Sequence, residues 1–414
     1  MTLSEELTWR GFKNQTTYKD IAVLDGKPIT FYLGMDPSAD SLQAGNLAVA
    51  MMIRHFIDHG HKAIMLVGGA TGLIGDPDGK DDERELKSRE EVERNKKAIS
   101  KQYDRILNGK TFERVDNYDW FKDMGYLDFL RDVGKHVPMS QMLGREFVQS
   151  RLGEEGSGIS YAEFSYSLIQ GYDFLHLYRT KGATLQLCGS DQWGNSIAGV
   201  ELIRRIEGAE AHIWSAPLVI NKSTGKKFGK SEGGAIWLDA EKTTPTAFYQ
   251  FWVTTDDASV EDLLKIYTLL PKEEIEQVLA THTENRSQRH AQKVLAAEVT
   301  RLIHGDEALE IAQTVTECLT GERSLGDAKD VLDEMKQEIP SVTVGAEGSL
   351  IEVLVAAGLA SSNGDARRLL ASNAISCNGQ KVTAESMPID LFVDGLALLR
   401  RGKAFKDSAL LELR

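Results

Sequence analysis

The chain has 414 residues, which is enough for two or three domains, and its 42% hydrophobic and 27% charged residues are typical of globular proteins. The net charge of −14 argues against unspecific binding of nucleic acids by the whole surface. No apolar run is long enough to cross a bilayer, the amino terminus lacks a signal-peptide core, and the three distant cysteines have no metal-ligand spacing. We therefore expect a cytoplasmic protein without membrane segments or a dedicated metal site.

The charge is unevenly distributed along the chain. Residues 349–414 contain 8 Lys and Arg against 7 Asp and Glu, a net charge of +1, whereas the rest of the chain has 40 basic and 55 acidic residues, a net charge of −15. A polyanionic partner would therefore favour the C-terminal segment.

In chain order, residues 1–28 look peripheral, and the stretch 29–47 is the first that points to a ligand. Its pattern predicts a buried strand at 29–33, a turn, a polar loop and a helix capped by Ser41. A strand that leads into a helix start presents free backbone N–H groups to an anion. Gly45 would let a flat ring or a phosphate approach the backbone closely.

The next elements repeat this alternation. The apolar run 62–69 is typical of a parallel strand covered on both faces, and it precedes a turn-rich loop at 70–80 and a charged helix at 81–105. The helical stretch 126–150 has apolar residues that belong either to the core or to a contact with a second subunit, and we prefer the second interpretation. These residues are Leu127, Phe129, Leu130 and Val133.

A long helix at 159–177, a strand at 184–188, a turn and helix from 189, and a short strand at 216–220 follow. The alternation over 29–220 predicts an α/β fold with a doubly wound parallel sheet, in which ligands bind at the carboxyl ends of the strands. From 242 to 321 the pattern is helical. Residues 322–348 read as a linker with one short helix, and 349–414 read as a small α+β domain with an Asn378-Gly379 hairpin.

Several polar groups in this pattern suggest chemistry. KFGKS at 227–231 places two lysines around a glycine turn, where both can reach one phosphate chain, although such a loop alone is more often plain surface. Tyr166, Gln170 and Asp173 share one helix face, either as a ligand site or as a surface stripe. Asp191 in GSDQWGN could bind ribose hydroxyls or cap a helix, and Asp76 could bind a ligand or stabilise a turn.

Four motifs together resemble those of the bacterial-type tyrosyl-tRNA synthetases, which are class I aminoacyl-tRNA synthetases. They occur in the family's order, as YLGMDPSADSL, GGATGLIGDPDGK, FSYSLIQGYDF followed by LQLCGSDQWGN, and KFGKSEGGAIWL. The resemblance runs from about residue 28 to the end, where DARRLLASNAISCNG is similar to the S4-like RNA-binding domain of these enzymes.

The resemblance implies a Rossmann-like catalytic domain at 1–220 with a dimer-forming insertion near 120–155, and a catalytic loop and connection at 221–241. It further implies a helical anticodon-binding domain at 242–321, the linker at 322–348 and an S4-like domain at 349–414.

The resemblance also implies roles for individual residues. Tyr32 and Asp173 match the pair that hydrogen-bonds the phenol hydroxyl of tyrosine. Asp76, Tyr166 and Gln170 match the groups that hold its amino group.

The remaining matches concern the tyrosine carboxylate and ATP. Gln192 matches a residue beside the carboxylate, and Gln186 is assigned to the tyrosine site with it. The positions matched to ATP contacts are Gly34, Asp36, Gly45, Gly189, Asp191 and Lys230. The positions matched to the mobile KMSKS-type loop of the family are Lys227, Lys230 and Ser231.

One motif departs from the family pattern. The HIGH signature, whose first histidine stabilises the reacting phosphates, stands here as Gln43-Ala44-Gly45-Asn46. Gln43 is neutral, Asn46 keeps a hydrogen-bond donor, and Ser38 adds a hydroxyl nearby. Our hypothesis is that help to the leaving group is reduced or rearranged, while the two lysines of the loop and Mg²⁺ carried with ATP supply most of the charge.

The implied reaction joins L-tyrosine and ATP to tyrosyl-adenylate and pyrophosphate, and then transfers the tyrosyl group to the 3′ end of tRNA(Tyr). The family also implies a homodimer. Two alternatives remain, a non-catalytic RNA-binding protein on the same fold and a tryptophanyl relative. Intact KFGKS and GSDQW argue against the first, and Tyr32 with Asp173 argues against the second.

Overall fold

The computed structural model describes residues 1–76, 86–144, 146–152, 158–231, 234–402 and 407–414. The chain folds into two compact units. The first consists of Met1–Lys242 and Thr255–Leu295, and the second of Thr243–Thr254 and Ala296–Arg414. In the part of the chain that is described, no helix is both long and apolar enough to span a bilayer.

The first unit contains a six-stranded sheet in the order β1-β6-β5-β2-β3-β4. Its strands are β1 (Gln15–Thr16), β2 (Thr30–Met35), β3 (Lys62–Val67), β4 (Phe112–Asp116), β5 (Leu185–Gly189) and β6 (His212–Ala216). All neighbours are parallel except β1, which runs antiparallel to β6. The chain winds from β2 through β3 to β4 and returns to β5 on the other side of β2, which confirms the predicted doubly wound sheet.

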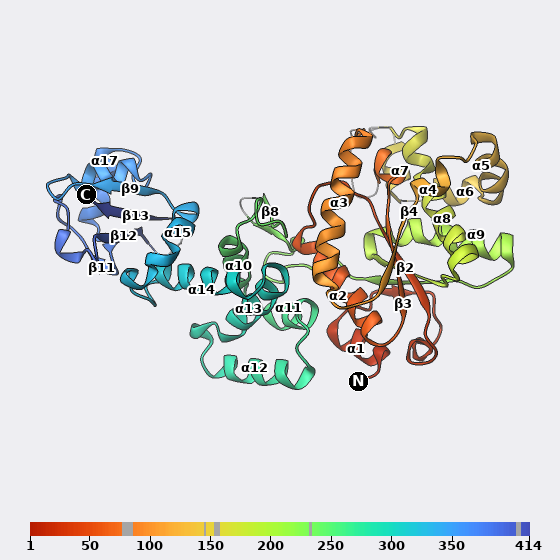
Figure 1. Cartoon of the computed structure of the whole chain (residues 1–414), viewed down its shortest axis with the longest axis horizontal. Helices are drawn as coiled ribbons and strands as arrows, with labels where there is room; N and C mark the ends of the chain where they lie inside the picture. Colours follow the sequence, from red (N-terminus) through yellow and green to blue (C-terminus); the bar gives the residue numbers. More distant parts are fainter. Residues whose placement is uncertain (77–85, 145, 153–157, 232–233, 403–406) are drawn as a thin grey trace. The chain divides into compact units, whose positions relative to one another are not determined.

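Helices cover both faces of this sheet (Figure 1). Alternate residues of a strand point to opposite faces, so Phe31 meets Phe56 of α2, at 5.3 Å between ring centroids, while Tyr32 packs against Phe174 of α8. The helices of this unit are α1 (Leu3–Arg10), α2 (Ala44–Asp58), α3 (Arg89–Ile106), α4 (Tyr118–Phe121), α5 (Tyr126–Asp132), α6 (Met139–Leu143), α7 (Glu146–Leu152), α8 (Tyr161–Lys181), α9 (Trp193–Glu207), α11 (Val260–Tyr267) and α12 (Lys272–Glu284). Helix α13 (His290–His304) begins in this unit and ends in the second.

Two strands differ from the sequence prediction. The strand predicted at 216–220 is wrong, because β6 lies before it at His212–Ala216, and Pro217 cannot donate a ladder hydrogen bond. Strand β4 was not predicted at all. Glu113 and Arg114 are exposed at this edge of the sheet, so the segment lacks the apolar run that marks the central strands.

The amino-terminal segment is not peripheral, contrary to the prediction for 1–28. The guanidinium of Arg10 is buried and donates to the backbone carbonyl oxygens of Lys265 at 2.9 Å, Thr268 at 3.1 Å and Leu270 at 2.8 Å. The last carbonyls of a helix have no partner within it. Arg10 therefore satisfies the carboxyl end of α11.

The second unit contains a five-stranded sheet in the order β11-β10-β12-β13-β9, in which only the β13–β9 pair is parallel. Its strands are β9 (Ser341–Val344), β10 (Ile375–Cys377), β11 (Gln380–Lys381), β12 (Leu396–Arg401) and β13 (Ser408–Leu413). The predicted hairpin is confirmed, since β10 and β11 pair around Asn378 and Gly379, whose φ angles are 44° and 81°.

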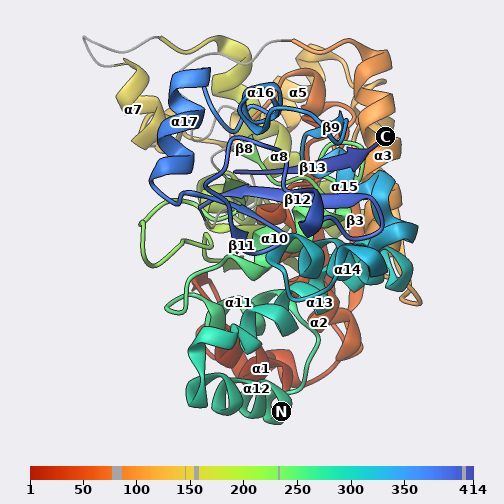
Figure 2. The ribbon, with the colours of Figure 1, turned by 90° about the vertical axis from the view of Figure 1, so that its left-hand side faces the viewer.

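Helical elements cover both faces of the second sheet. The helical elements of this unit include α10 (Pro245–Val253), which packs on α14 rather than on the sheet, α14 (Asp306–Thr320), the 3₁₀ helix η6 (Leu325–Val331), α15 (Leu332–Glu338), α16 (Leu350–Ala356) and α17 (Asn363–Ala371). One face packs on α16 and α17, and the other packs on α14, η6 and α15. Figure 2 shows β12 and β13 side by side, with α16 and α17 next to them.

The segment 322–348, predicted to be a linker, is packed into the second unit. Leu325, Met335 and Ile339 are each at most 4% exposed, and β9 pairs with β13. The linker prediction rested on few aromatic residues, many acidic residues and several Gly or Pro residues in this segment. Its apolar residues nevertheless recur where η6 and α15 face the sheet.

Candidate active site

The predicted phenol pair lies where β2 meets α8. Tyr32 is 1% exposed and Asp173 is 2% exposed. The Tyr32 ring lies 5.0 Å from that of Phe174, the residue after Asp173. Burial, and then the charge of Asp173, raises the pKa of Tyr32 well above its ordinary value. The Tyr32 hydroxyl has no hydrogen-bond partner among the described residues, and a buried hydroxyl in that state is costly unless a ligand bonds it.

Two donors that the sequence analysis missed hold the Asp173 carboxylate. Asn117 Nδ2 donates to Oδ2 at 3.1 Å, and Trp120 Nε1 donates to Oδ1 at 2.9 Å. The Trp120 ring stacks on His176, with centroids 4.4 Å apart and planes 16° apart. Both donors come directly after β4, so missing that strand hid them.

The pKa of Asp173 reflects these opposing influences. Burial raises it well above the ordinary value, the hydrogen bonds from Asn117 and Trp120 lower it, and the charges of Asp36 and Asp116 raise it. The donors therefore counteract part of the cost of burying the carboxylate.

The residues predicted to hold the amino group and the carboxylate of tyrosine form a second cluster. Tyr166 Oη donates to Asp36 Oδ2 at 2.7 Å. Gln192 Nε2 donates to Asp76 Oδ2, and Asn195 Nδ2 lies 3.4 Å from Asp76 Oδ1. Carboxylates and amides from three strand ends thus converge, and Asn195 is a member that the prediction did not name.

Other predicted residues lie near this cluster with fewer contacts. Gln186 stands opposite Tyr32 in the β2–β5 pairing, is 2% exposed, and its Oε1 has no partner in the described part of the chain. Gln170 lies one helical turn from Tyr166 and is half-buried. Asp191 is exposed at the start of α9, where it does not cap the helix.

Three predicted positions between β2 and the start of α2 are solvent-accessible. They are Gly34, Ser38 and Gly45. A Cβ on Gly189 would lie 2.5 Å from Asp191 Oδ1, so the exposed side chain of Asp191 would have to move to admit one.

The start of α2 differs from the prediction in two ways. Gln43, not Ser41, is its N-cap residue. The predicted free N–H groups are partly used, because Gln43 N donates to Asn46 Oδ1 at 3.0 Å and Ala44 N donates to Ile236 O at 2.9 Å. Since Asn46 is exposed and its Oδ1 is fixed by this bond, its Nδ2 remains as the outward donor.

The KFGKS loop lies against this helix start. Gly229 has φ 93°, and a Cβ there would lie only 3.0 Å from Gly45 N. Phe228 is buried, with its ring 5.8 Å from that of Tyr267 at the end of α11. Lys227 is exposed.

Beyond Gly229 the loop continues into two short strands. Strand β7 (Lys230–Ser231) pairs with β8 (Gly234–Ala235). The side chains of Lys230 and Ser231 lie outside the described part of the structure.

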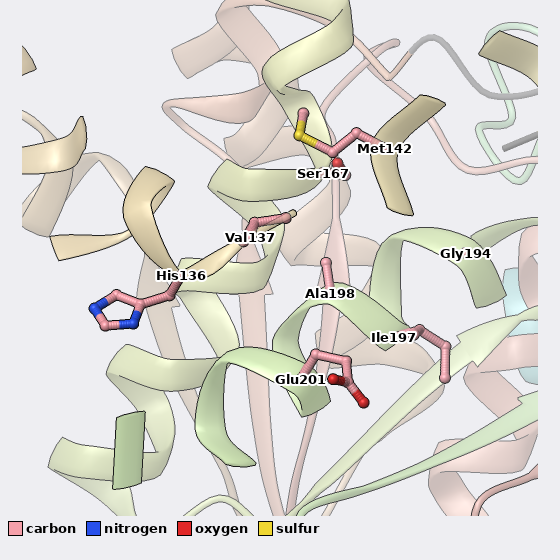
Figure 3. A pocket seen from close by; sticks show the side chains of 8 residues that line it. All are labelled: His136, Val137, Met142, Ser167, Gly194, Ile197, Ala198 and Glu201. Carbon is pink, nitrogen blue, oxygen red and sulfur yellow. The ribbon is translucent and has the colours of Figure 1, made fainter. Parts of the chain in front are cut away.

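A hollow of about 220 Å³ lies elsewhere in the first unit. Figure 3 shows it between the segment that carries His136 and Met142 and helices α8 and α9. Its lining residues are His136, Val137, Met142, Ser167, Gly194, Ile197, Ala198 and Glu201. None of the predicted substrate residues lines it, so it is separate from the clusters above.

Comparison with known proteins agrees with this geometry. Residues 24–320 match the family model "tRNA synthetases class I (W and Y)", and residues 331–405 match "Tyrosine--tRNA ligase SYY-like C-terminal domain". The tyrosine–tRNA ligase of Geobacillus kaustophilus is 46% identical over 97% of this chain and 98% of its own length. This chain belongs to the tyrosine–tRNA ligases, in the class I tRNA synthetase family.

Further relatives agree with this assignment. The tyrosine–tRNA ligase of Lactococcus lactis is 44% identical over 97% of this chain and 98% of its own length. The C-terminally truncated mitochondrial tyrosyl-tRNA synthetase of Aspergillus nidulans superposes with a TM-score of 0.69 at 29% identity, covering 77% of this chain and 94% of that one. The ligase is therefore an enzyme, and the alternatives of a non-catalytic RNA-binding protein and a tryptophanyl relative are wrong.

Proposed function

We propose that this ligase activates L-tyrosine with ATP to tyrosyl-adenylate and pyrophosphate, and then transfers the tyrosyl group to the 3′ end of tRNA(Tyr). The observation that carries the proposal is the buried, unpartnered hydroxyl of Tyr32 beside the doubly hydrogen-bonded carboxylate of Asp173. A phenol hydroxyl entering there can bond both groups. Phenylalanine and tryptophan cannot, and would leave buried polar groups unpaired.

The rest of the tyrosine site follows from the second cluster. Asp76, Tyr166 and Gln170 would hold the ammonium group, where the carboxylate of Asp76 supplies the negative charge. Gln192, already bonded to Asp76, would lie beside the substrate carboxylate, with Gln186 at the floor of the site. Fixed in this way, the carboxylate can attack the α-phosphorus of ATP without a general base, so positioning and electrostatics carry the catalysis.

The nucleotide would lie along the exposed loops that follow β2 and β5. Asp191 and Gly189 would contact the ribose, and Gly34, Asp36 and Gly45 would line the nucleotide site. The residues proposed to act on the phosphates are Ser38, Gln43, Asn46, Lys227, Lys230 and Ser231. Mg²⁺ would enter bound to the ATP phosphates, as part of the substrate.

The tRNA would contact the carboxyl-terminal half of the chain. We propose an anticodon-binding role for the helical region 242–321 and an RNA-binding role for 349–414, whose net charge of +1 contrasts with −15 elsewhere. We also propose that the ligase acts in the cytoplasm, since its three cysteines are buried thiols that form no disulfide.

We further propose a homodimer formed through the insertion near 120–155. Large apolar side chains are exposed there, including Leu127 at 78%, Tyr126 at 62% and Met139 at 57%. Tyr161, at 62%, extends the patch through a 3.3 Å contact between its hydroxyl and that of Tyr126. Several large apolar side chains exposed within one insertion are typical of a protein interface.

The first test is isotope exchange between ATP and pyrophosphate, with each amino acid added separately. We expect exchange that depends on tyrosine, and we expect Gln43→His to raise its rate by up to about tenfold, because an imidazolium donor adds charge near the phosphates. Exchange that requires tryptophan, or none at all, would refute the proposed reaction. A Gln43→His rate at or below the wild-type rate would refute the idea that Gln43 weakens leaving-group stabilisation.

Lys227→Ala should lower the rate of adenylate formation by about 100-fold and leave tyrosine affinity nearly unchanged, because the charge acts mainly in the transition state. Lys226→Ala is the matched control, since both lysines are exposed on the same loop. Single-turnover kinetics and equilibrium tyrosine binding separate the two effects. An equal loss of rate and affinity would contradict the role of Lys227.

Tyr32→Phe should weaken tyrosine binding roughly 10-fold and reduce selection against phenylalanine, while folding stability stays nearly constant, because the lost hydroxyl has no partner among the described residues. Asp173→Ala should weaken tyrosine binding further, because it also leaves Asn117 and Trp120 without their acceptor. Tyrosine titration and thermal unfolding measure both quantities. Unchanged tyrosine affinity in Asp173→Ala would refute the phenol site.

Leu127→Asp should convert the dimer to monomer and raise the dissociation constant at least about 100-fold. In a two-fold symmetric dimer each substitution occurs twice, so two charged side chains would enter the interface. Val23→Asp is the control, since Val23 is also exposed, at 46%, but lies in the 3₁₀ helix η1 (Ile21–Asp25), away from the insertion. Sedimentation equilibrium measures the mass of each variant. A monomeric wild type, or a Leu127→Asp dimer, would contradict the interface.

A further inference from the structure

An ion pair between α3 and the end of β4 has no part in the roles proposed so far. Lys96 Nζ donates to Asp116 Oδ2, and the two side chains are 16% and 21% exposed. Lys96 also lies 2.7 Å from Glu93 Oε1, but Glu93 is 55% exposed, where an ion pair is worth little. The contact with the half-buried carboxylate of Asp116 is therefore the one that we expect to matter for the structure around Lys96.

The second oxygen of Asp116 organises two backbone segments. Its Oδ1 accepts hydrogen bonds from Gly69 N at 3.0 Å and from Tyr118 N at 2.9 Å. The carboxylate lies so close to the chain that a Cβ on Gly69 would be 2.3 Å from Oδ1. Asp116 thus joins the loop after β3 to the turn after β4.

The next residue, Asn117, carries this arrangement into the tyrosine site. Its Oδ1 accepts from Ala70 N at 2.7 Å, and its Nδ2 donates to Thr71 Oγ1 at 3.1 Å and to Asp173 Oδ2 at 3.1 Å. A primary amide that makes three bonds has one orientation, and that orientation aims a donor at Asp173. Any shift of the backbone at 116–117 moves this donor.

We infer that Lys96 and Asp116 are positioning residues for phenol recognition, because they fix the backbone that aims Asn117 and Trp120 at Asp173. The ion pair holds the end of β4 against α3, and it offsets the charge of Asp116 near the Asp173 carboxylate. This inference rests on the proposed role of Asp173 in binding the phenol hydroxyl.

The charge balance supports the same conclusion. Asp36, Asp116 and Asp173 bring three carboxylates to one region, and the charges of Asp36 and Asp116 raise the pKa of Asp173. Lys96 is the cation paired with Asp116, so removing it leaves that charge uncompensated next to the site. The loss would affect tyrosine, which bonds Asp173, more than ATP, which would lie along other loops.

The test compares steady-state kinetics of Lys96→Met and Asp116→Asn with those of the wild type. We expect the KM for tyrosine to rise on the order of tenfold in each, and selection of tyrosine over phenylalanine to fall. The KM for ATP and kcat should stay within about twofold. Lys96→Arg, which keeps the ion pair, should restore the tyrosine KM.

The matched control is Glu93→Gln, which removes the other carboxylate partner of Lys96 and should leave the tyrosine KM unchanged. A purely structural ion pair would lower the thermal unfolding midpoint and leave both KM values and amino-acid selection unchanged, and that result would overturn the inference. If Lys96→Met does not fold, Asp116→Asn and Lys96→Arg test the inference by the same comparison of the KM for tyrosine with the KM for ATP and with amino-acid selection. Failure of the proposed function is recognised separately, by a wild type without tyrosine-dependent exchange or an Asp173→Ala variant with normal tyrosine affinity.

Discussion

The proposed amino-acid site depends on one buried carboxylate. Asp173 is 2% exposed, and an isolated charge at that depth would be neutralised by protonation. Two nitrogen donors, from Asn117 and Trp120, keep both of its oxygens bonded. Since both donors follow β4, the register of that edge strand and the packing of α8 must agree for the site to exist.

The two ends of the site are built on different principles. The end proposed to bind tyrosine is enclosed, and directional hydrogen bonds define it. The other end is lined by glycine-rich backbone, with Gly45 and Asn46 exposed and Gly229 packed closely on the start of α2. An enclosed end suits recognition of a fixed side chain, and an open end suits the proposed binding of ATP, from which pyrophosphate would have to leave.

The sequence allowed prediction of those parts of the fold whose signals are local. A few adjacent residues are enough to predict the apolar strand β3 and the Asn378-Gly379 turn. Strand β4 carries no such signal, because Glu113 faces solvent at the sheet edge. The cap expected from Ser41 failed for a non-local reason, since its hydroxyl accepts from Gln102 Nε2 at 2.9 Å and from the backbone N–H of residue 239 at 3.2 Å.

The same distinction applies to the site. Tyr32, Asp76 and Gln192 were predicted because they stand in recognisable motifs, but Asn117 and Trp120 became visible only through tertiary contacts. A side chain that holds another in place is recognised by the short distance between the two in the folded protein. A single sequence does not show that distance.

The position of Arg10 has a practical consequence for how the chain can be handled. Met1 is 57% exposed, so an affinity tag can be fused to the amino terminus without disturbing packed residues. Trimming the chain past Arg10 would leave three carbonyl oxygens, in the last turn of α11 and just after it, without their donor. Tyr267, against which the KFGKS loop packs, is the last residue of that helix. The first ten residues therefore have to be retained in any shortened version meant to keep the loop in place.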